Sequence, residues 1–434
     1  MNRRPASALL LIGLYILFPL GFTALYFIGN LYSFGALFEV YNLSIIAGAV
    51  AYILFMGQFL LSARLRFIER TFAQDKLLVA HGTMGMVTAS LVLAQFILKY
   101  LTILRYGSFT VQSIIGFAAL LIYAALIPGA LLVLQGRARN RKKSPPYERN
   151  RKLHNLFALA GVLAVVHVYL ATSTWTLTLK LSTLIWGLVC LSAYVWHKII
   201  RPKNAKKLKL NEVVPLTPEI SAYRFSAEDD LPRRRSGQFG YFRFASDPPG
   251  SEEHPFTIAS AAKEDVEIIV KASGDYTDAM RRSITNTEVL FDGPYGRFFP
   301  DLLPDGTRLY FIGGGIGITP FLSMIRDEEL RERFPMSLLW SVRTPEDEKS
   351  APAVSELAAA GTIDLHMVYT REAPAGRETG RIVPDLIGQI IQDNDSRKCP
   401  VFLCGPKGFG PGIRSALKSL GFPRSAIHEE KFSW

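Results

Sequence analysis

The sequence predicts a multidomain membrane protein in three parts: a six-helix transmembrane bundle, an antiparallel β-barrel domain and an α/β domain with a parallel sheet. Three observations predict this class. Apolar residues are concentrated before residue 200, short β-like runs split by Pro, Gly and acidic turns follow to about residue 300, and strands then alternate with helical stretches. We therefore expect domains over 1–200, 201–300 and 301–434.

Six apolar runs are each long enough to cross about 30 Å of hydrocarbon as a helix. They cover 7–29, 41–62, 77–98, 111–134, 153–175 and 181–199. The first run has a long apolar core with no small-residue cleavage site after it, so we expect a membrane span rather than a cleaved signal.

The net charge of +12 follows the predicted topology. Basic residues crowd the connections after the second, fourth and sixth spans, including Arg64, Arg70, Arg137, Lys142, Arg151, Lys198 and Lys207. The alternate connections hold far fewer, namely Lys99, Arg105 and Lys180. This positive-inside pattern predicts that both termini lie in the cytoplasm, and it argues against a nucleic-acid partner. The expected location is a bacterial plasma membrane. Three cysteines (Cys190, Cys399 and Cys404) do not make a disulfide framework, which suits a cytosolic catalytic half.

A glycine-rich turn follows the first predicted strand of the α/β domain, Arg308–Ile312. Its small residues let the backbone approach a pyrophosphate, and the amides of the following helix favour negative charge. They are Gly313, Gly314, Gly315 and Gly317. We expect Thr319 to be the N-cap of that helix and Pro320 to occupy its first position. The spacing departs from the usual dinucleotide fingerprint, since Pro320 stands where a third small residue is usual.

After the second strand of the α/β domain, Ser341 and Arg343 are candidates to hold a 2′-phosphate, because an arginine fork matches phosphate geometry. The acidic residues Glu346, Asp347 and Glu348 nearby weaken that case. The sequence favours NADPH over NADH modestly.

Histidines lie within the predicted membrane spans. His81 is in the third span, and His154 and His167 are in the fifth. Ionisable residues inside a membrane are costly and are candidates for function, and imidazole is a common axial ligand of haem iron. His81 and His154 both lie near the inner end of their spans, so we expect them to meet at similar depth. His197, at the cytoplasmic end of the sixth span, is interpreted as interfacial.

Residues 206–434 resemble the ferredoxin–NADP reductase superfamily, and the order of motifs is most similar to NADPH oxidases and ferric reductases. The resemblance implies an FAD-ring segment at His254, Pro255, Phe256 and Thr257, with Ser260 close behind. It implies a cradle for the FAD pyrophosphate at Lys271, Gly274 and Thr277, and a nicotinamide pocket at Cys404, Gly405 and Pro406. It also implies a C-terminal tail from Glu430 to Trp434, in which Trp434 stacks on the flavin and gives way to nicotinamide. Asp292–Gly296 resembles the turn that links the two lobes.

In the same families the third and fifth spans each carry two histidines, which hold two stacked haems. By this resemblance His81 and His154 hold an inner b-type haem. The outer site departs from the pattern: Gln95 stands where the second histidine of the third span is expected, and His167 follows His154 by thirteen residues. That spacing places the two histidines apart on an ideal helix unless the helix is distorted near Gly161. The expectation is one haem, or two if Gln95 and His167 hold another.

The expected function is a membrane flavocytochrome that passes electrons from NAD(P)H through FAD to haem. The expected acceptors are oxygen, giving superoxide, and a ferric chelate. One alternative is a membrane-anchored NAD(P)H:flavin or quinone reductase with one or no haem. Another is a six-span channel with a nucleotide-sensing domain, which is disfavoured because the sequence has neither a Thr-Val-Gly-Tyr-Gly filter nor a spaced-arginine helix.

Overall fold

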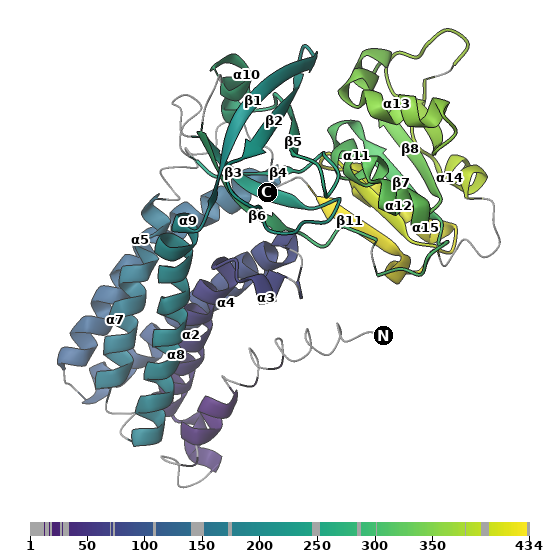
Figure 1. The fold of residues 1–434 in the computed structure, drawn as a ribbon. Coiled ribbons are helices and arrows are strands. Elements are labelled where there is room, and N and C mark those ends of the chain that lie inside the picture. Colours follow the sequence, from purple (N-terminus) through teal and green to yellow (C-terminus); the bar gives the residue numbers. More distant parts are fainter. Residues whose placement is uncertain are drawn as a thin grey trace. The chain divides into compact units, whose positions relative to one another are not determined.

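The computed structural model divides the chain into two compact units, Met1–Lys203 and Asn204–Trp434 (Figure 1). The residues that it describes are 13, 17, 20–26, 28, 34–69, 71–72, 74–106, 110–139, 152–171, 176–244, 252–283, 288–300, 302–377, 379–391 and 399–431.

The first unit is helical. Its long helices are α2 (Val40–Ser62), α4 (Gln74–Tyr106), α5 (Val111–Arg139), α7 (Phe157–Leu170) and α8 (Leu177–Val195). Short helical segments accompany them: η1 (Phe34–Phe38), α3 (Arg66–Glu69), a π-helical turn η3 (Trp196–Ile200) and α9 (Arg201–Lys203). Among the described residues, five helical segments are long and apolar enough to cross a membrane, and they match the second to sixth predicted spans. The expected span over 7–29 lies largely outside the described residues.

Helix α2 forms the buried centre of this unit, packing against α4 and α8, while α5 packs against α7. Its middle turns place Tyr52, Phe55, Met56 and Phe59 in one apolar cluster. Helix α8 is tied to it by two hydrogen bonds to backbone oxygens, from Tyr52 Oη to Thr183 (2.9 Å) and from Trp186 Nε1 to Ile53 (3.2 Å). Because the middle turns of α2 are buried on all sides, this helix needs apolar side chains all round and shows little amphipathic pattern.

The outer surfaces of the other helices carry large apolar side chains. Leu104 on α4, Ile114 on α5 and Leu177 on α8 are each more than 60% exposed. Large apolar side chains exposed on several helices are typical of a surface that faces a membrane or another protein.

The first half of the second unit is a six-stranded antiparallel sheet. Its strands are β1 (Lys206–Thr217), β2 (Ile220–Ala227), β3 (Phe239–Phe244), β4 (His254–Thr257), β5 (Val266–Lys271) and β6 (Glu288–Tyr295), with helix α10 (Asp275–Ser283) inserted after β5. The strand order is β4-β3-β6-β1-β2-β5, and a bridge between Ile258 and Ile268 joins the two edges. Inward side chains such as Leu208, Tyr223 and Phe242 fill the interior of this barrel. Asp292–Tyr295, expected in a linking turn, instead lies within β6.

The second half is a five-stranded parallel sheet, as expected. Its strands are β7 (Leu309–Gly314), β8 (Met336–Val342), β9 (Asp364–Tyr369), β10 (Val401–Gly405) and β11 (Ile427–Lys431), in the order β11-β10-β7-β8-β9. The helical segments between them are η4 (Gly315–Ile318), α11 (Thr319–Arg326), α12 (Glu328–Arg333), η5 (Pro345–Ser350), α13 (Pro352–Ala359), α14 (Pro384–Ile390), α15 (Phe409–Ser419) and η7 (Arg424–Ala426). The order reverses between β7 and β10, and ligands of open parallel sheets bind outside the strand ends at such a switch point.

Barrel and sheet share one core and are joined through α11 and the residue after it. Ser236 donates to Asp327 (2.6 Å), and the Ser323 hydroxyl accepts from the amide of Gly237 (3.2 Å) and donates to the carbonyl of Ser260 (2.7 Å). The Glu267 carboxylate, 9% exposed, accepts from Arg224 of the barrel (2.8 Å) and from Arg326 of α11. The two lobes of this unit are therefore held together by buried polar contacts as well as by apolar packing.

We expect Glu267→Gln to destabilise the second unit by about 1–3 kcal/mol, because it removes a buried charged acceptor from two arginines. The matched control is Glu212→Gln, since Glu212 binds the same Arg224 but is 55% exposed. It should change the free energy of unfolding by less than about 1 kcal/mol. Thermal and urea unfolding of both variants measure this, and equal effects of the two changes would contradict it.

The stabilisation from Glu267 should also depend on pH. Burial alone raises the pKa of this carboxyl, but hydrogen bonds and charges from Arg224 and Arg326 outweigh burial and lower the pKa below its usual range. A carboxylate with a lowered pKa stabilises the fold above the pKa of the unfolded state, about 4.3 for Glu. The difference between wild type and Glu267→Gln should therefore shrink as the pH falls below that value.

Candidate functional site

The glycine turn lies at the carboxyl end of β7, where the order of the parallel sheet reverses. Gly315 has a φ of +51°, a conformation that residues with a side chain rarely adopt. The indole of Trp340, fully buried on β8, donates to the carbonyl of Gly315 (3.1 Å). A side chain of the neighbouring strand β8 therefore holds the backbone of the turn in place.

Gly317 brings this turn against the carboxyl end of β10. A Cβ atom at Gly317 would lie 2.6 Å from the carbonyl oxygen of Cys404 and 2.7 Å from Cα of Gly405. The ring of Phe409 covers both Gly314 and Gly405, at 3.1 Å and 2.4 Å from the Cβ positions that those glycines lack. Hence the fold brings the predicted nucleotide turn and the predicted nicotinamide segment together at the switch point.

Helix α11 begins one residue earlier than the sequence suggested. Thr319 is its first residue rather than its N-cap, and the Thr319 hydroxyl donates to the carbonyl of Ile316 (3.2 Å). The expectation for Thr319 as N-cap was wrong, because the turn Gly315–Ile318 already has helical backbone and Ile318 takes the cap position. Pro320 lies in the first turn of α11, as its fixed φ favours.

Cys404 is fully buried at the end of β10, and Pro406 follows Gly405 there. Burial, together with the charges of Glu430 and Glu429, raises the pKa of the Cys404 thiol well above its usual value. Glu430 is paired with Cys404 across β10 and β11, and its Oε1 would lie 3.8 Å from a Cβ atom at Gly296 of the barrel. Glu430 therefore lies where the two lobes of the second unit meet. Trp434 lies outside the described residues.

The predicted flavin-ring segment forms β4, at one edge of the barrel sheet. The His254 ring stacks on Tyr276 of α10, with centroids 3.6 Å apart and an interplanar angle of 25°, and its Nε2 lies 3.2 Å from Glu252. Pro255 and Phe256 are half-buried, while Thr257 is buried. The stack brings the strand that carries His254 next to the helix that carries the predicted pyrophosphate cradle.

That cradle lies where β5 ends and α10 begins. Gly274 is exposed with no heavy atom within 4 Å of its Cβ position, so a ligand has room to approach. The Thr277 hydroxyl is used locally, accepting from the amides of Ser273 (2.9 Å) and Gly274 (3.2 Å). Lys271 pairs with Glu219 at 3.3 Å.

Two other predicted site residues are engaged within the protein. Ser260 is 3% exposed, and its hydroxyl accepts from the amide of Glu267 (3.0 Å). Ser341 is half-buried in β8, and Arg343, just after it, binds Asp347 and Glu219. The geometry gives Ser260 a role in holding the barrel.

In the first unit, the structure brings His81 and His154 together. Their ring centroids are 6.0 Å apart with an interplanar angle of 64°. A metal ion bonded to an imidazole nitrogen at about 2 Å on each side places two ring centroids roughly 6 Å apart. Nδ1 of His81 is buried without a hydrogen bond of normal geometry, and His154 is exposed. The separation of the two rings leaves room for one metal ion between them, so His81 and His154 are the residues that would hold a haem iron.

His154 precedes the helix that carries His167. Residues 152–154 form a helical turn, 155–156 break it, and α7 starts at Phe157. The distortion that the spacing of the two histidines required is therefore at 155–156, whereas Gly161 lies inside regular helix. The expectation of a distortion near Gly161 was wrong, because glycine is only one of several causes of a break in a helix.

Gln95 and His167 point to different helices. His167 Nδ1 lies 2.6 Å from the carbonyl of Gln112 on α5, and its ring packs on Gly116 of that helix. The amide of Gln95 packs on Gly48 of α2, 2.6 Å from the Cβ position there. Nothing in these contacts pairs the two side chains across a common ligand.

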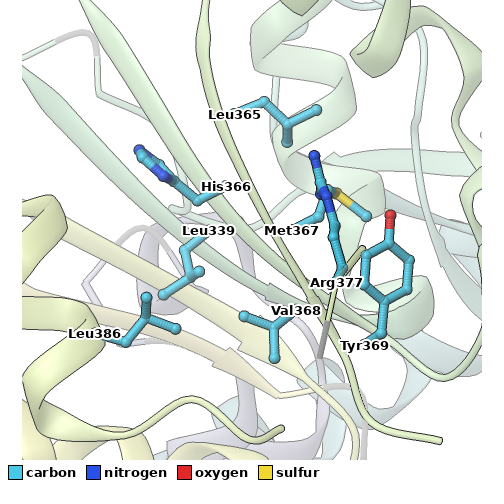
Figure 2. A pocket seen from close by; sticks show the side chains of 8 residues that line it. All are labelled: Leu339, Leu365, His366, Met367, Val368, Tyr369, Arg377 and Leu386. Atoms are coloured by element: carbon cyan, nitrogen blue, oxygen red, sulfur yellow. The ribbon is translucent and has the colours of Figure 1, made fainter. Parts of the chain in front are cut away.

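Two further features bear on where a site lies. Among the described residues there is no group of three or more His, Cys, Asp or Glu side chains suited to a metal ion. A cavity of about 360 Å³ lies around β9, and Figure 2 shows Leu365, Met367 and Tyr369 on one side of that strand with His366 and Val368 on the other. The residues that line this cavity come from both faces of an edge strand, and Gly317 and Cys404 are not among them. We therefore place no active site there.

Sequence reasoning missed Trp340, Tyr276 and Phe409 as supports of the site. Trp340 reads as an ordinary core residue of a strand, and its bond to Gly315 depends on strand order. Phe409 lies three residues after Pro406, and an aromatic residue so close to two expected close-approach glycines was the one signal available.

Comparison with known families agrees with this geometry. Residues 209–298 match the family model of an FAD-binding domain, and residues 311–415 match that of an oxidoreductase NAD-binding domain. The two halves of the second unit therefore match families of cofactor-binding domains, one for FAD and one for NAD.

Individual relatives match about half of the chain. The ferredoxin reductase component of 3-ketosteroid-9-alpha-monooxygenase from Rhodococcus rhodochrous is 29% identical over 240 residues, 52% of this chain and 64% of the relative. The reductase component of propane 2-monooxygenase from Rhodococcus jostii is 26% identical, with 54% of this chain and 65% of the relative covered. Dual oxidase 2 from Rattus norvegicus is 27% identical over 50% of this chain and 15% of its own length.

Among solved structures, a ferredoxin NADP+ reductase from Neisseria gonorrhoeae with bound FAD and NADP is 23% identical. It aligns with a TM-score of 0.46 over 52% of this chain and 97% of its own. The chain spans 65% and 64% of the length of the two monooxygenase reductase relatives, which is less than two thirds.

Proposed function

We propose that this protein is a membrane flavocytochrome oxidoreductase of the NADPH oxidase and ferric reductase type. It oxidises NAD(P)H on the cytoplasmic side of a bacterial plasma membrane and delivers electrons to a b-type haem and on to oxygen or a ferric chelate. The observation that carries the proposal is the His81–His154 ring pair, at 6.0 Å, in the same chain as an FAD- and NAD-binding reductase module.

FAD held here would supply hydride acceptance and one-electron release, and the residues of the barrel would bind and orient it. We assign His254, Pro255, Phe256 and Thr257 to the flavin ring, with His254 fixed by its stack on Tyr276. Lys271, Gly274 and the first amides of α10 then face the pyrophosphate, because lysine charge and helix amides both favour phosphate.

The nucleotide binds across the carboxyl ends of β7 and β10. Gly313, Gly314, Gly315 and Gly317 allow its pyrophosphate to approach the backbone, and the helix that starts at Thr319 and Pro320 supplies amide donors. Cys404, Gly405 and Pro406 shape the nicotinamide end. Cys404 acts there as a neutral thiol, since burial raises its pKa, and Glu430 is placed where the lobes meet.

A second candidate function follows from the separate contacts of Gln95 and His167. With no second imidazole pair, a single haem at His81 and His154 leaves about half of a ~30 Å core without a carrier. The protein is then a membrane NAD(P)H reductase whose acceptor, such as a quinone, is reached within the bilayer. An outer haem would have a single imidazole from the middle of the spans, that of His167, whose ring is oriented by the carbonyl of Gln112.

An acceptor panel tests the proposal. Detergent-purified protein with NADH or NADPH is assayed for superoxide (superoxide dismutase-sensitive cytochrome c reduction), for ferric-chelate reduction and for quinone reduction. We expect nucleotide oxidation to require one of these acceptors. Turnover with a quinone alone supports the second candidate, and nucleotide binding without oxidation contradicts both.

A further inference from the structure

Arg343 directly follows β8, the second strand of the parallel sheet in chain order. In dinucleotide-binding sheets, an acidic residue at this place binds the ribose hydroxyls of NAD, and an arginine accommodates the 2′-phosphate of NADP. This chain has both residue types there, so coenzyme choice depends on what the guanidinium already binds.

Asp347 occupies one bidentate edge of that guanidinium. Nε donates to Oδ2 and Nη2 donates to Oδ1, each at 3.1 Å. Asp347 Oδ2 also accepts from the backbone amides of Arg343 (3.1 Å) and Thr344 (3.4 Å), and the Asp347 side chain is only 14% exposed. The carboxylate is thus fixed by backbone as well as by side-chain donors.

Glu219 occupies the second bidentate edge of the Arg343 guanidinium. It lies in the turn between β1 and β2 of the barrel, and its Oε2 accepts from Arg343 Nη2 at 3.0 Å. Nη2 is shared by both bidentate edges of a guanidinium, and here it donates to both Asp347 and Glu219. Arg343 therefore presents no free two-pronged face to a phosphate.

The local charge also opposes a 2′-phosphate. Hydrogen bonds from Arg343 and Lys271 lower the pKa of Glu219, so the Glu219 carboxylate is ionised at neutral pH. Arg343 and Lys271 are balanced by Glu219 and Asp347, and a phosphate would add about two negative charges beside those carboxylates.

We infer that Asp347 and Glu219 make this protein select NADH against NADPH, by holding Arg343 in a carboxylate-bound state that excludes the 2′-phosphate. The inference rests on the proposed NAD(P)H oxidation, and it favours NADH where the sequence favoured NADPH modestly. Asp347 and Glu219 act through Arg343 and are positioning residues.

The test compares kcat/KM for NADH and NADPH in full-length protein with an artificial electron acceptor. We expect wild type to favour NADH by about tenfold or more, and Glu219→Gln with Asp347→Asn to raise kcat/KM for NADPH by about tenfold. Glu346→Gln is the matched control, because Glu346 lies in the same loop but pairs with Lys349 (2.8 Å), outside the Arg343 network. It should leave the NADH/NADPH ratio unchanged.

Direct binding keeps the inference testable if the double variant does not fold. On wild type, 5′-ADP should compete with NADH at lower concentration than 2′,5′-ADP does, and the exposed single change Glu219→Gln should narrow that gap. A wild-type preference for NADPH, or tighter binding of 2′,5′-ADP, overturns the inference and leaves the reductase function intact. No oxidation of either coenzyme and no binding of either fragment refutes both.

Discussion

Replacing His81 or His154 with alanine is expected to abolish the b-type haem spectrum of the purified protein. Each change removes one of the two imidazoles whose rings lie 6.0 Å apart, and one remaining ligand holds haem far less tightly. FAD content and NAD(P)H oxidation with an artificial acceptor should persist, since those depend on residues 204–434. Absorption spectra and flavin release on denaturation measure the two cofactors separately.

His197→Ala is the control for this prediction, because it removes an imidazole from the end of the last predicted span and should leave the haem spectrum intact. His81→Met provides a second check: methionine is also an axial ligand, so haem should return with a raised midpoint potential. Haem retained at wild-type level in both His81→Ala and His154→Ala would contradict the assignment.

Gly317→Ala is expected to lower kcat/KM for the nucleotide by about a hundredfold. The added methyl group would lie 2.6–2.7 Å from backbone atoms of Cys404 and Gly405, which are not free to rotate away. Separating β7 from β10 by even a fraction of an ångström displaces the nucleotide turn, and misplacement of about 1 Å costs roughly 10²-fold. We also expect a loss of about 1–3 kcal/mol in the free energy of unfolding.

Gly412→Ala is the matched control for that change. Gly412 lies in α15 with no atom within 4 Å of its Cβ position, so alanine there should stabilise the helix by up to about 1 kcal/mol and leave turnover unchanged. A Gly317→Ala protein with near-normal kcat/KM would show that the nucleotide does not bind at this turn.

The sequence predicted most of the second unit because its signals are local. The strand expected over Arg308–Ile312 is β7, Leu309–Gly314, and the one expected over Asp364–Tyr369 is β9 with the same bounds. Glycine and proline mark the turns between such strands, and apolar runs mark the spans. Five of the six predicted spans correspond to helices among the described residues.

What the sequence left undecided depends on distant contacts. In the sequence Arg343 is a candidate phosphate ligand weakened by nearby acidic residues, and only the fold brings Glu219, 124 residues away, to its guanidinium. A break at 155–156 separates the turn that carries His154 from the helix that carries His167, and helical spacing alone did not locate that break. In each case the sequence showed what chemistry the residue could perform, whereas its contact partner depended on how the chain folds.

The most direct test of the account is the haem-to-FAD ratio of detergent-purified protein expressed with saturating haem, together with an anaerobic spectrum before and after adding NADH. We predict at least one haem per FAD, reduced by NADH without oxygen. A ratio of two would add an outer haem at His167 despite Gln95. Protein that retains FAD and oxidises NADH but contains no haem would contradict the central claim and leave a membrane-anchored flavin reductase.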